Sequence, residues 1–174
     1  GAKLEEEKLA ASIEVYNAHN AAMRELAAVL ADHPEVTAAQ RSDVYKSAFF
    51  MLKEEHTALV RELIDALKAS APGAEKIRIL TTGILADAPG LTEILDSVGM
   101  HIVADDVAAE SRQYRTDAPA EGTAMARLAA KFCAMDNCSV LYDVEKNRVA
   151  KIVADFDFDR IVYLGNIALK GVAQ

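Results

Sequence analysis

The stretch from residue 77 to residue 117 places the strongest constraint on how this chain can fold. It opens with the apolar run 77–80, in which β-branched residues predominate. Apolar residues then recur at helical spacing over 91–98, and a second apolar run follows at 101–104. This order predicts a strand, a helix and a second strand that lies parallel to the first.

Residues typical of helix starts and helix ends in this stretch support the same interpretation. Pro89 suits the first turn of the helix, and Gly99 suits a left-handed C-terminal cap. Polar residues gather where the strands end, at Thr82-Gly83 after the first and at Asp105-Asp106 after the second. Ligands of open α/β sheets bind outside the carboxyl ends of the strands. The sequence therefore predicts a site at this edge of the sheet.

The first part of the chain has a helical pattern. Residues 4–31 predict an amphipathic helix that ends before Pro34. Thr37 is placed to cap a second helix, with Gln40 at the capping-box position three residues later. That helix continues to about residue 67, and a break near 47–51 is compatible with its sequence.

Ala71-Pro72-Gly73 combines a helix stop with a turn and marks the clearest boundary in the chain. We therefore expect a helical hairpin over residues 1–71 and an α/β domain over residues 75–174. The hairpin must pack on the α/β part or on another subunit, because it cannot bury its apolar face alone. The predicted fold class is α/β, with the hairpin packed on a three-layer α/β/α Rossmann-like domain. Its short parallel sheet is predicted to have strands near 77–82, 101–105, 139–142 and 160–164.

Charge and cysteine content exclude several classes of function. The net charge of −8 and the absence of a basic stripe argue against nucleic acid as a partner. No apolar run approaches the roughly 20 residues that cross a bilayer, and the acidic N-terminus does not resemble a signal peptide. Cys133 and Cys138 are expected to be free thiols in a cytoplasmic protein, because two cysteines are too few for a closed zinc site.

Two groups at the strand ends are candidates for binding or catalysis. The backbone amides of Thr81-Thr82-Gly83 suit an anion or a thioester oxygen, but a tight turn explains the same residues equally well. Asp105 and Asp106 suit general acid–base chemistry or magnesium binding. Neighbouring strand residues point to opposite faces, however, so the two carboxylates need not share a site. One of them is more simply explained as a turn cap or as a partner of Arg112 or Arg115.

Ser111 and Arg112 follow as the better candidates for ligand contact, because an arginine fork binds carboxylate or phosphate. His56 lies among carboxylates on a predicted helix, where a solvated surface histidine is more common than a catalytic one. The candidate edge of a substrate cavity therefore consists of Thr82, Gly83, Asp106, Ser111 and Arg112. These residues define a place for a site but no reaction.

Five longer strings carry a resemblance to a known family. They are YNAHNAAMREL, KSAFFMLKEEHTALVREL, TTGILADAP, IVADDVAAESRQYRTDAP and NCSVLYDVEKNR. Together they resemble the 2-hydroxyacyl-CoA dehydratase family, which includes the D-component of 2-hydroxyglutaryl-CoA dehydratase and has benzoyl-CoA reductase subunits as relatives. The similarity extends from about residue 13 to residue 164.

The resemblance implies a lyase that acts in the cytoplasm of anaerobes. It implies a heterodimer of homologous subunits, an acyl-CoA substrate and an iron–sulfur (4Fe–4S) cluster held by three cysteines of each subunit. It further implies an ATP-dependent activator protein that injects one electron. A ketyl radical then forms on the acyl-CoA, hydroxide leaves, and an enoyl-CoA results.

The chain also departs from the family pattern. The family's cluster cysteines lie in an N-terminal domain and in a KFCDP-like motif after the strand that matches 160–164, where this chain has none. The chain thus resembles the middle domain of a subunit. We expect the isolated chain to be inactive and without a cluster, whose ligands lie outside it. The alternative is a Rossmann-like ligand-binding or subunit-assembly module that acts alone, without catalysis.

Overall fold

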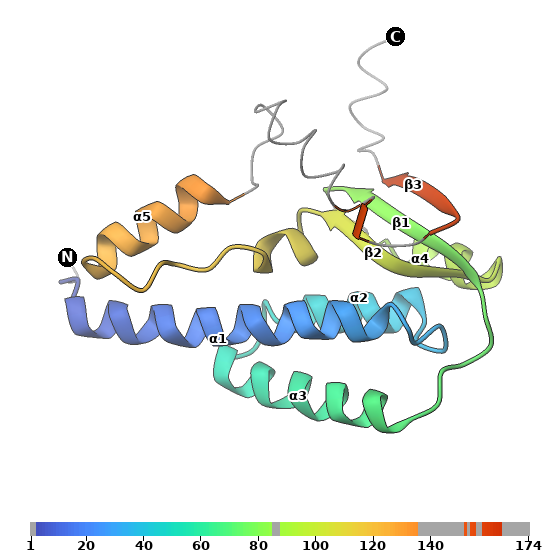
Figure 1. The fold of residues 1–174 in the computed structure, drawn as a ribbon, viewed down its shortest axis with the longest axis horizontal. Helices are drawn as coiled ribbons and strands as arrows, with labels where there is room; N and C mark the ends of the chain where they lie inside the picture. Colours follow the sequence, from blue (N-terminus) through green and yellow to red (C-terminus); the bar gives the residue numbers. More distant parts are fainter. Residues whose placement is uncertain (1–2, 85–87, 136–151, 153, 156–157, 165–174) are drawn as a thin grey trace, which may run out of the picture.

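The computed structural model describes residues 3–84, 88–135, 152, 154–155 and 158–164, and it shows a mixed α/β fold with a short parallel sheet (Figure 1). Its elements, in chain order, are α1 Glu6–Leu30, α2 Ala38–Ser47, α3 Lys53–Ala69, β1 Ile77–Gly83, α4 Pro89–Ser97, β2 Met100–Val107, the 3-10 helix η1 Ser111–Tyr114, α5 Ala124–Ala134 and β3 Arg160–Leu164. Within the described part of the chain, no helix combines the length and the apolar character needed to cross a membrane.

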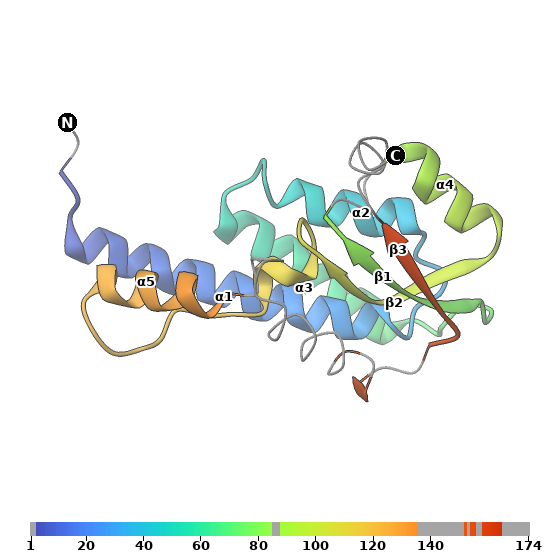
Figure 2. The same cartoon turned by 90° about the horizontal axis from the view of Figure 1, so that it is seen from above.

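Helix α1 is the long axis of the molecule, and elements from both halves of the chain pack along it. Helix α3 lies along one side of α1, whereas η1 and α5 lie along another (Figures 1 and 2). The core between α1 and α3 contains Met23, Leu26, Val60 and Ile64, and Tyr114 of η1 joins the same cluster. Part of the surface of α1 is thus buried against η1 and α5 of the α/β part, which is one of the two alternatives that the sequence left open.

Helix α2 begins at the predicted capping box. The Thr37 side chain accepts a hydrogen bond from the Gln40 amide, and the Gln40 side chain accepts one from the Thr37 amide. A carboxylate from α4 adds a second cap, because Asp96 Oδ1 accepts from the Ala38 amide at 2.7 Å. The chain then leaves helical geometry between Ser47 and Lys53, so the single helix expected to continue to about residue 67 is two helices, separated near 47–51 where the sequence allowed a break.

The sheet has the strand order β2–β1–β3 within the described residues, and both pairings are parallel. The parallel pairing of β1 with β2 confirms the strand–helix–strand unit. A register shift leaves Val103 without a partner, because Ile79 pairs with Ile102 while Leu80 pairs with Ala104. This bulge changes the register of the carboxyl half of β2, in which Asp105 then pairs with Thr81 and Asp106 with Thr82.

Apolar side chains of the strands are buried on both faces of the sheet. Ile79 and Ile102 pack against Ala38 of α2 and Leu95 of α4. On the other face, Leu80 packs with Ala104 and with Ile152, which lies in a helical stretch. This double burial explains why β1 and β2 read as apolar runs rather than as alternating patterns.

Two glycines are required by the backbone. Gly99 has a φ of 70°, the left-handed geometry that the sequence predicted for the cap of α4. At Gly73, a Cβ would lie 2.9 Å from the Glu35 Cβ, and the Gly73 amide donates to Glu35 Oε2 at 2.7 Å. The boundary turn is therefore tied to the end of the first helical segment.

Other expectations differ from the structure or lie outside its description. Phe132 stands at helical spacing from Leu128, a pattern that predicts a core-facing side chain, but it is 60% exposed, because α5 contacts α1 through Ala124, Arg127 and Leu128 instead. The strand near 139–142 lies outside the described residues. The division into domains 1–71 and 75–174 stays a prediction.

Candidate functional site

The carboxyl edge of the sheet brings the predicted strand-end residues together. Thr82 of β1 pairs in register with Asp106 of β2, and Gly83 pairs with Val107. The chain then turns from β2 into η1, so that Ser111 and Arg112 fold back toward Asp105 and Asp106. The proximity of Thr82 to Asp106 follows from the predicted order of the strands, whereas Ser111 and Arg112 reach them through the turn after β2.

Thr82 and Gly83 do not form the tight turn that was one interpretation of the sequence. Strand β1 continues through Gly83, with β2 on one side and β3 on the other. The Gly83 carbonyl also accepts a hydrogen bond from the Ala108 amide. Because parallel pairing on both sides uses the backbone amides, these two residues belong to the sheet rather than to an anion-binding loop.

Asp105 is the partner of an arginine from a distant helix. Arg41 of α2 donates to Asp105 Oδ2 and to Glu110 Oε2, and all three side chains are buried. Asp105 Oδ1 accepts from the Val107 and Ser111 amides at 3.0 and 3.1 Å. Burial works to lower the pKa of Arg41, but the carboxylates raise it above the ordinary value, so the guanidinium stays charged.

Asp106 has a separate pair of arginine partners. Arg112 Nη2 lies 2.9 Å from Asp106 Oδ2, and Arg115 Nη1 lies 2.8 Å from Asp106 Oδ1. Arg112 also donates to the Asp106 carbonyl at 2.7 Å, and Arg115 donates to the Ser111 hydroxyl at 2.9 Å. Asp106 is fully buried. The two acids therefore serve two different ion-pair clusters, as expected for neighbours on a strand.

These contacts explain the polar residues at the sheet edge as parts of buried ion-pair clusters. The two clusters together contain three acids and three arginines, so the buried edge carries no net formal charge. The guanidinium of Arg112 is bound to Asp106, and the Arg112 side chain is 8% exposed. A role for Thr82, Gly83, Asp106, Ser111 and Arg112 at a substrate cavity stays a prediction.

His56 is buried, which corrects the expectation of a solvated histidine on a helix surface. Its Nδ1 lies 2.9 Å from Nε2 of His19, and both side chains are at most 2% exposed. The expectation was wrong because the exposed face of α3 could not be told apart from the face that meets α1. Burial lowers the pKa of His19 to about 4, with further contributions from Lys53 and His56.

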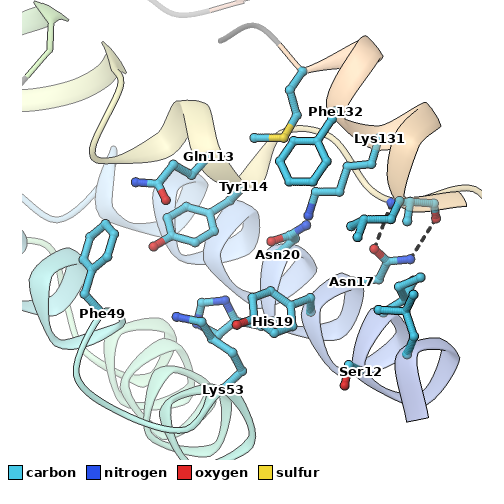
Figure 3. A pocket seen from close by; sticks show the side chains of 16 residues that line it. Ser12, Asn17, His19, Asn20, Phe49, Lys53, Gln113, Tyr114, Lys131 and Phe132 are labelled. Carbon is cyan, nitrogen blue, oxygen red and sulfur yellow. Dashed lines mark hydrogen bonds between the residues drawn. The ribbon is translucent and has the colours of Figure 1, made fainter. Parts of the chain in front are cut away.

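Polar residues of α1 clamp the segment that follows η1. Asn17 forms two hydrogen bonds with the Ala118 backbone, at 2.9 and 3.0 Å (Figure 3). Arg24 binds Asp117 through both of its terminal nitrogens, at 3.0 and 2.7 Å, and Asn20 adds a third bond to the same carboxylate. The strings YNAHNAAMREL and ESRQYRTDAP thus contact each other directly.

A pocket of about 510 Å³ lies beside this clamp, bounded by α1, η1, α5 and the turn before α3 (Figure 3). Its lining is mostly apolar, and polar groups reach it from α1, α3, η1 and α5. The lining includes the apolar residues Ile13, Leu128 and Phe132 and the polar residues His19, Lys53 and Lys131.

The sequence predicted none of the polar residues of this pocket. Lys53 and Lys131 each look like ordinary charged positions of amphipathic helices. Only the cluster of Asn17, His19 and Asn20 in the middle of an alanine-rich amphipathic helix could have indicated that α1 contributes to a polar site.

Comparison with protein families gives one match that covers nearly the whole chain. The family model described as "2-hydroxyglutaryl-CoA dehydratase, D-component" matches residues 1–168.

Three curated relatives agree with this match. The chain is 44% identical over 155 residues to the (R)-phenyllactyl-CoA dehydratase beta subunit of Clostridium sporogenes, covering 88% of this chain and 41% of the relative. It is 42% identical over 152 residues to lactoyl-CoA dehydratase subunit beta of Anaerotignum propionicum, covering 85% of this chain and 40% of the relative. It is 36% identical over 137 residues to (R)-2-hydroxyglutaryl-CoA dehydratase, subunit beta, of Acidaminococcus fermentans, covering 77% of this chain and 36% of the relative. The chain thus spans about two fifths of the length of these relatives.

Proposed function

Because this chain belongs to the 2-hydroxyglutaryl-CoA dehydratase D-component family, we propose that it is part of a beta-type subunit of a 2-hydroxyacyl-CoA dehydratase. The observation that carries the proposal is 36–44% identity to three dehydratase beta subunits over most of the chain. The reaction is the loss of the C2 hydroxyl and a C3 proton, as water, to give an enoyl-CoA. The acyl group differs among the relatives, so the substrate is proposed only as a class.

We extend the proposal to the one-electron activation that the family resemblance implies. The subunit would pair with a homologous subunit in the cytoplasm of an anaerobe and would receive an electron from an ATP-dependent activator protein. The isolated chain is proposed to be inactive. An iron–sulfur cluster, bound elsewhere in the intact subunit, would supply the electron-transfer chemistry.

The described residues do not fit such a cluster. No group of three or more His, Cys, Asp or Glu side chains in the described part of the chain could hold a metal ion. Cys133 is exposed on α5, and Cys138 lies outside the described residues. Clusters are held mainly by several cysteine thiolates. We therefore assign no cluster ligand to the described residues and derive no step from them.

The described residues instead support a scaffolding role within the intact subunit. The ion pairs of Asp105 and Asp106 fix the turn at the carboxyl edge of the sheet. Rigid elements position functional groups more accurately than unsupported loops. We propose that this edge, with Thr82 and Ser111, faces the acyl-CoA cavity of the full subunit, and that the sheet belongs to a three-layer Rossmann-like domain.

An anaerobic reconstitution tests the proposed function. The intact subunit that contains this chain would be produced with its partner subunit and the activator. Conversion of phenyllactyl-CoA, lactoyl-CoA and 2-hydroxyglutaryl-CoA to their enoyl-CoA products would then be followed with ATP present. The proposal predicts turnover of at least one substrate that requires both subunits, the activator and ATP. Lack of turnover of all three by a correctly assembled, cluster-loaded complex would contradict it.

The pocket of about 510 Å³ favours a second candidate function, that of a ligand-binding or assembly module. The sequence of the gene on both sides of this stretch separates the two candidates. The dehydratase proposal requires cysteines upstream and a KFCDP-like motif downstream. An open reading frame limited to these 174 residues would instead favour the binding module.

A further inference from the structure

The pocket beside α1 has the size and lining of a small-molecule site. Its volume of about 510 Å³ falls within the roughly 300–1,000 Å³ typical of ligand pockets. Ile13 and Leu128 form part of its apolar wall, and Phe132 extends from α5 over it (Figure 3). An apolar wall with a few polar groups selects a ligand that has an apolar body.

The charged groups of the pocket are all cationic. Lys53 and Lys131 are half-buried in its lining, and no Asp or Glu accompanies them among the described lining residues, although the chain has a net charge of −8. Lys53 donates to the Ala48 carbonyl oxygen. The described anion that acts on Lys131 is Asp117, whose carboxylate is already bound by Arg24. Burial lowers the pKa of both lysines. An anion in the pocket would stabilise these two partly desolvated ammonium groups.

The histidine pair adds a hydrogen-bond acceptor whose identity follows from its partners. His56 Nε2 lies 3.0 Å from Ser47 Oγ and 3.1 Å from the Val44 carbonyl oxygen. The Ser47 hydroxyl donates its proton to the same carbonyl at 2.8 Å, so both oxygens act as acceptors toward Nε2, which carries the proton. His56 Nδ1 is then the acceptor in the bond to His19, and His19 Nε2 is the donor.

His19 Nδ1 is consequently left with a lone pair, since burial keeps both rings neutral by lowering their pKa values. This nitrogen is buried, has no hydrogen-bond partner among the described residues, and belongs to a residue of the pocket lining. A buried polar atom without a partner costs free energy that a ligand donor would recover. A hydroxyl group is such a donor.

We propose that this pocket binds a small hydroxy acid, with its apolar body against α1 and α5, its carboxylate near Lys131 and Lys53, and its hydroxyl donating to His19 Nδ1. The proposal is independent of the proposed function, because it concerns binding of a free acid by this chain. A turnover assay and a binding assay can therefore fail separately.

Three related compounds test the proposal on the full 174-residue chain by isothermal titration calorimetry at pH 7. Phenyllactate carries all three features, 3-phenylpropionate lacks the hydroxyl, and 3-phenylpropane-1,2-diol keeps the C2 hydroxyl but lacks the carboxylate. We expect phenyllactate to bind most tightly. Loss of the hydroxyl should weaken binding about threefold to tenfold, and loss of the carboxylate should weaken it about tenfold or more.

Two measurements locate the binding site. Lys131→Met should reduce the preference for phenyllactate over the diol, whereas Lys68→Met serves as the matched control, because Lys68 is on α3, paired with Glu25 and outside the pocket lining. In long-range ¹⁵N–¹H spectra, phenyllactate should shift Nδ1 of His19 and leave the ring nitrogens of His101 unchanged. The latter ring is bonded to the Ala31 carbonyl outside the pocket.

Several results would overturn the proposal. Absence of saturation by phenyllactate at 10 mM (roughly the weakest binding expected for so few ligand atoms) would refute the site. Equal affinity for 3-phenylpropionate would refute the hydroxyl contact with His19, and equal affinity for the diol would refute the role of the lysines. Absence of binding together with concentration-dependent dimerisation through this face would assign the pocket to a second copy of the chain.

Discussion

His19 of α1 and His56, in the first turn of α3, are joined by a hydrogen bond of 2.9 Å between their rings. The ring centroids are 5.0 Å apart, and Tyr114 of η1 packs edge-on against His19. The second ring nitrogen of His56 is bonded to the Val44 carbonyl. A neutral histidine pair therefore links α1, α3 and η1.

This pair predicts a loss of stability in mild acid. The pKa of His19 is lowered to about 4, so the unfolded chain binds more protons than the folded chain between pH 6.5 and pH 4. The free energy of unfolding should therefore fall as pH falls through this window, by on the order of 2–3 kcal/mol. Urea unfolding at pH 7, 6, 5 and 4 measures the change.

The His19→Gln variant is the control for this prediction, because carboxylates also titrate near pH 4. The variant is expected to be less stable at pH 7 but to lose less stability on acidification than the unmodified chain. Identical pH slopes for the two proteins would show that the histidine pair does not titrate with folding.

Among single substitutions that remove a charge, we expect Arg41→Met to lower the free energy of unfolding most. Arg41→Met leaves the buried carboxylates of Asp105 and Glu110 without their shared cation. Breaking a buried ion pair in this way costs about 3–5 kcal/mol. Arg41→Lys should recover only part of the loss, since a single ammonium group cannot reproduce the fork that reaches both acids. Urea unfolding of the unmodified chain, Arg41→Met and Arg41→Lys measures the three free energies of unfolding.

Arg61→Met is the matched surface control for Arg41. Arg61 Nη1 lies 3.7 Å from Glu25 Oε2, and both side chains are exposed. Exposed pairs contribute about 0–1 kcal/mol, so this variant should unfold close to the unmodified chain. If both arginine variants lost the same stability, the ion pairs at the sheet edge would not be important for the fold.

Local signals explain which parts of the fold could be predicted from the sequence. The capping box of Thr37 and Gln40 and the cap at Gly99 involve residues a few positions apart, and the structure confirms them. The parallel pairing of β1 and β2 follows from a short connection through one helix, and it is confirmed too. Each of these features depends on chemistry within a single stretch of chain.

The features that could not be predicted depend on contacts between distant stretches. The burial of His56 requires α1, whose His19 lies 37 residues earlier, and the partner of Asp105 lies 64 residues earlier on α2. The bulge at Val103 leaves no mark on an apolar run. Phe132 has an apolar side chain at helical spacing, yet it borders a pocket. Pattern alone does not tell a core face from the wall of a site.

Arg112 tests whether the sheet edge acts through structure or through ligand contact. Arg112→Ala removes one of the two arginines that bind Asp106, and we expect a loss of about 3 kcal/mol in the free energy of unfolding of this chain. The double variant Asp106→Asn/Arg112→Ala should recover part of this loss, because it no longer leaves a poorly paired buried charge. Urea unfolding of the two variants measures the coupling.

The same substitution in the intact subunit separates the two roles of Arg112. Direct contact with acyl-CoA would raise the KM of Arg112→Ala while heterodimer stability stayed unchanged. A structural role would lower the yield of folded complex and leave the KM of the surviving enzyme close to normal. A change in neither KM nor heterodimer stability would dispose of the ligand-edge prediction for this residue.

The last prediction concerns iron. The isolated chain should purify without colour and without stoichiometric iron, even after anaerobic addition of iron and sulfide, since a cluster is normally fixed by about four ligands, most of them thiolates. Cys133 lies exposed on α5, and Cys138 is the only other cysteine of the sequence. Iron content and visible absorption after desalting measure the outcome, with Cys133→Ser and Cys138→Ser as paired variants. One cluster per chain, lost in Cys138→Ser, would show that this stretch carries part of the cluster site.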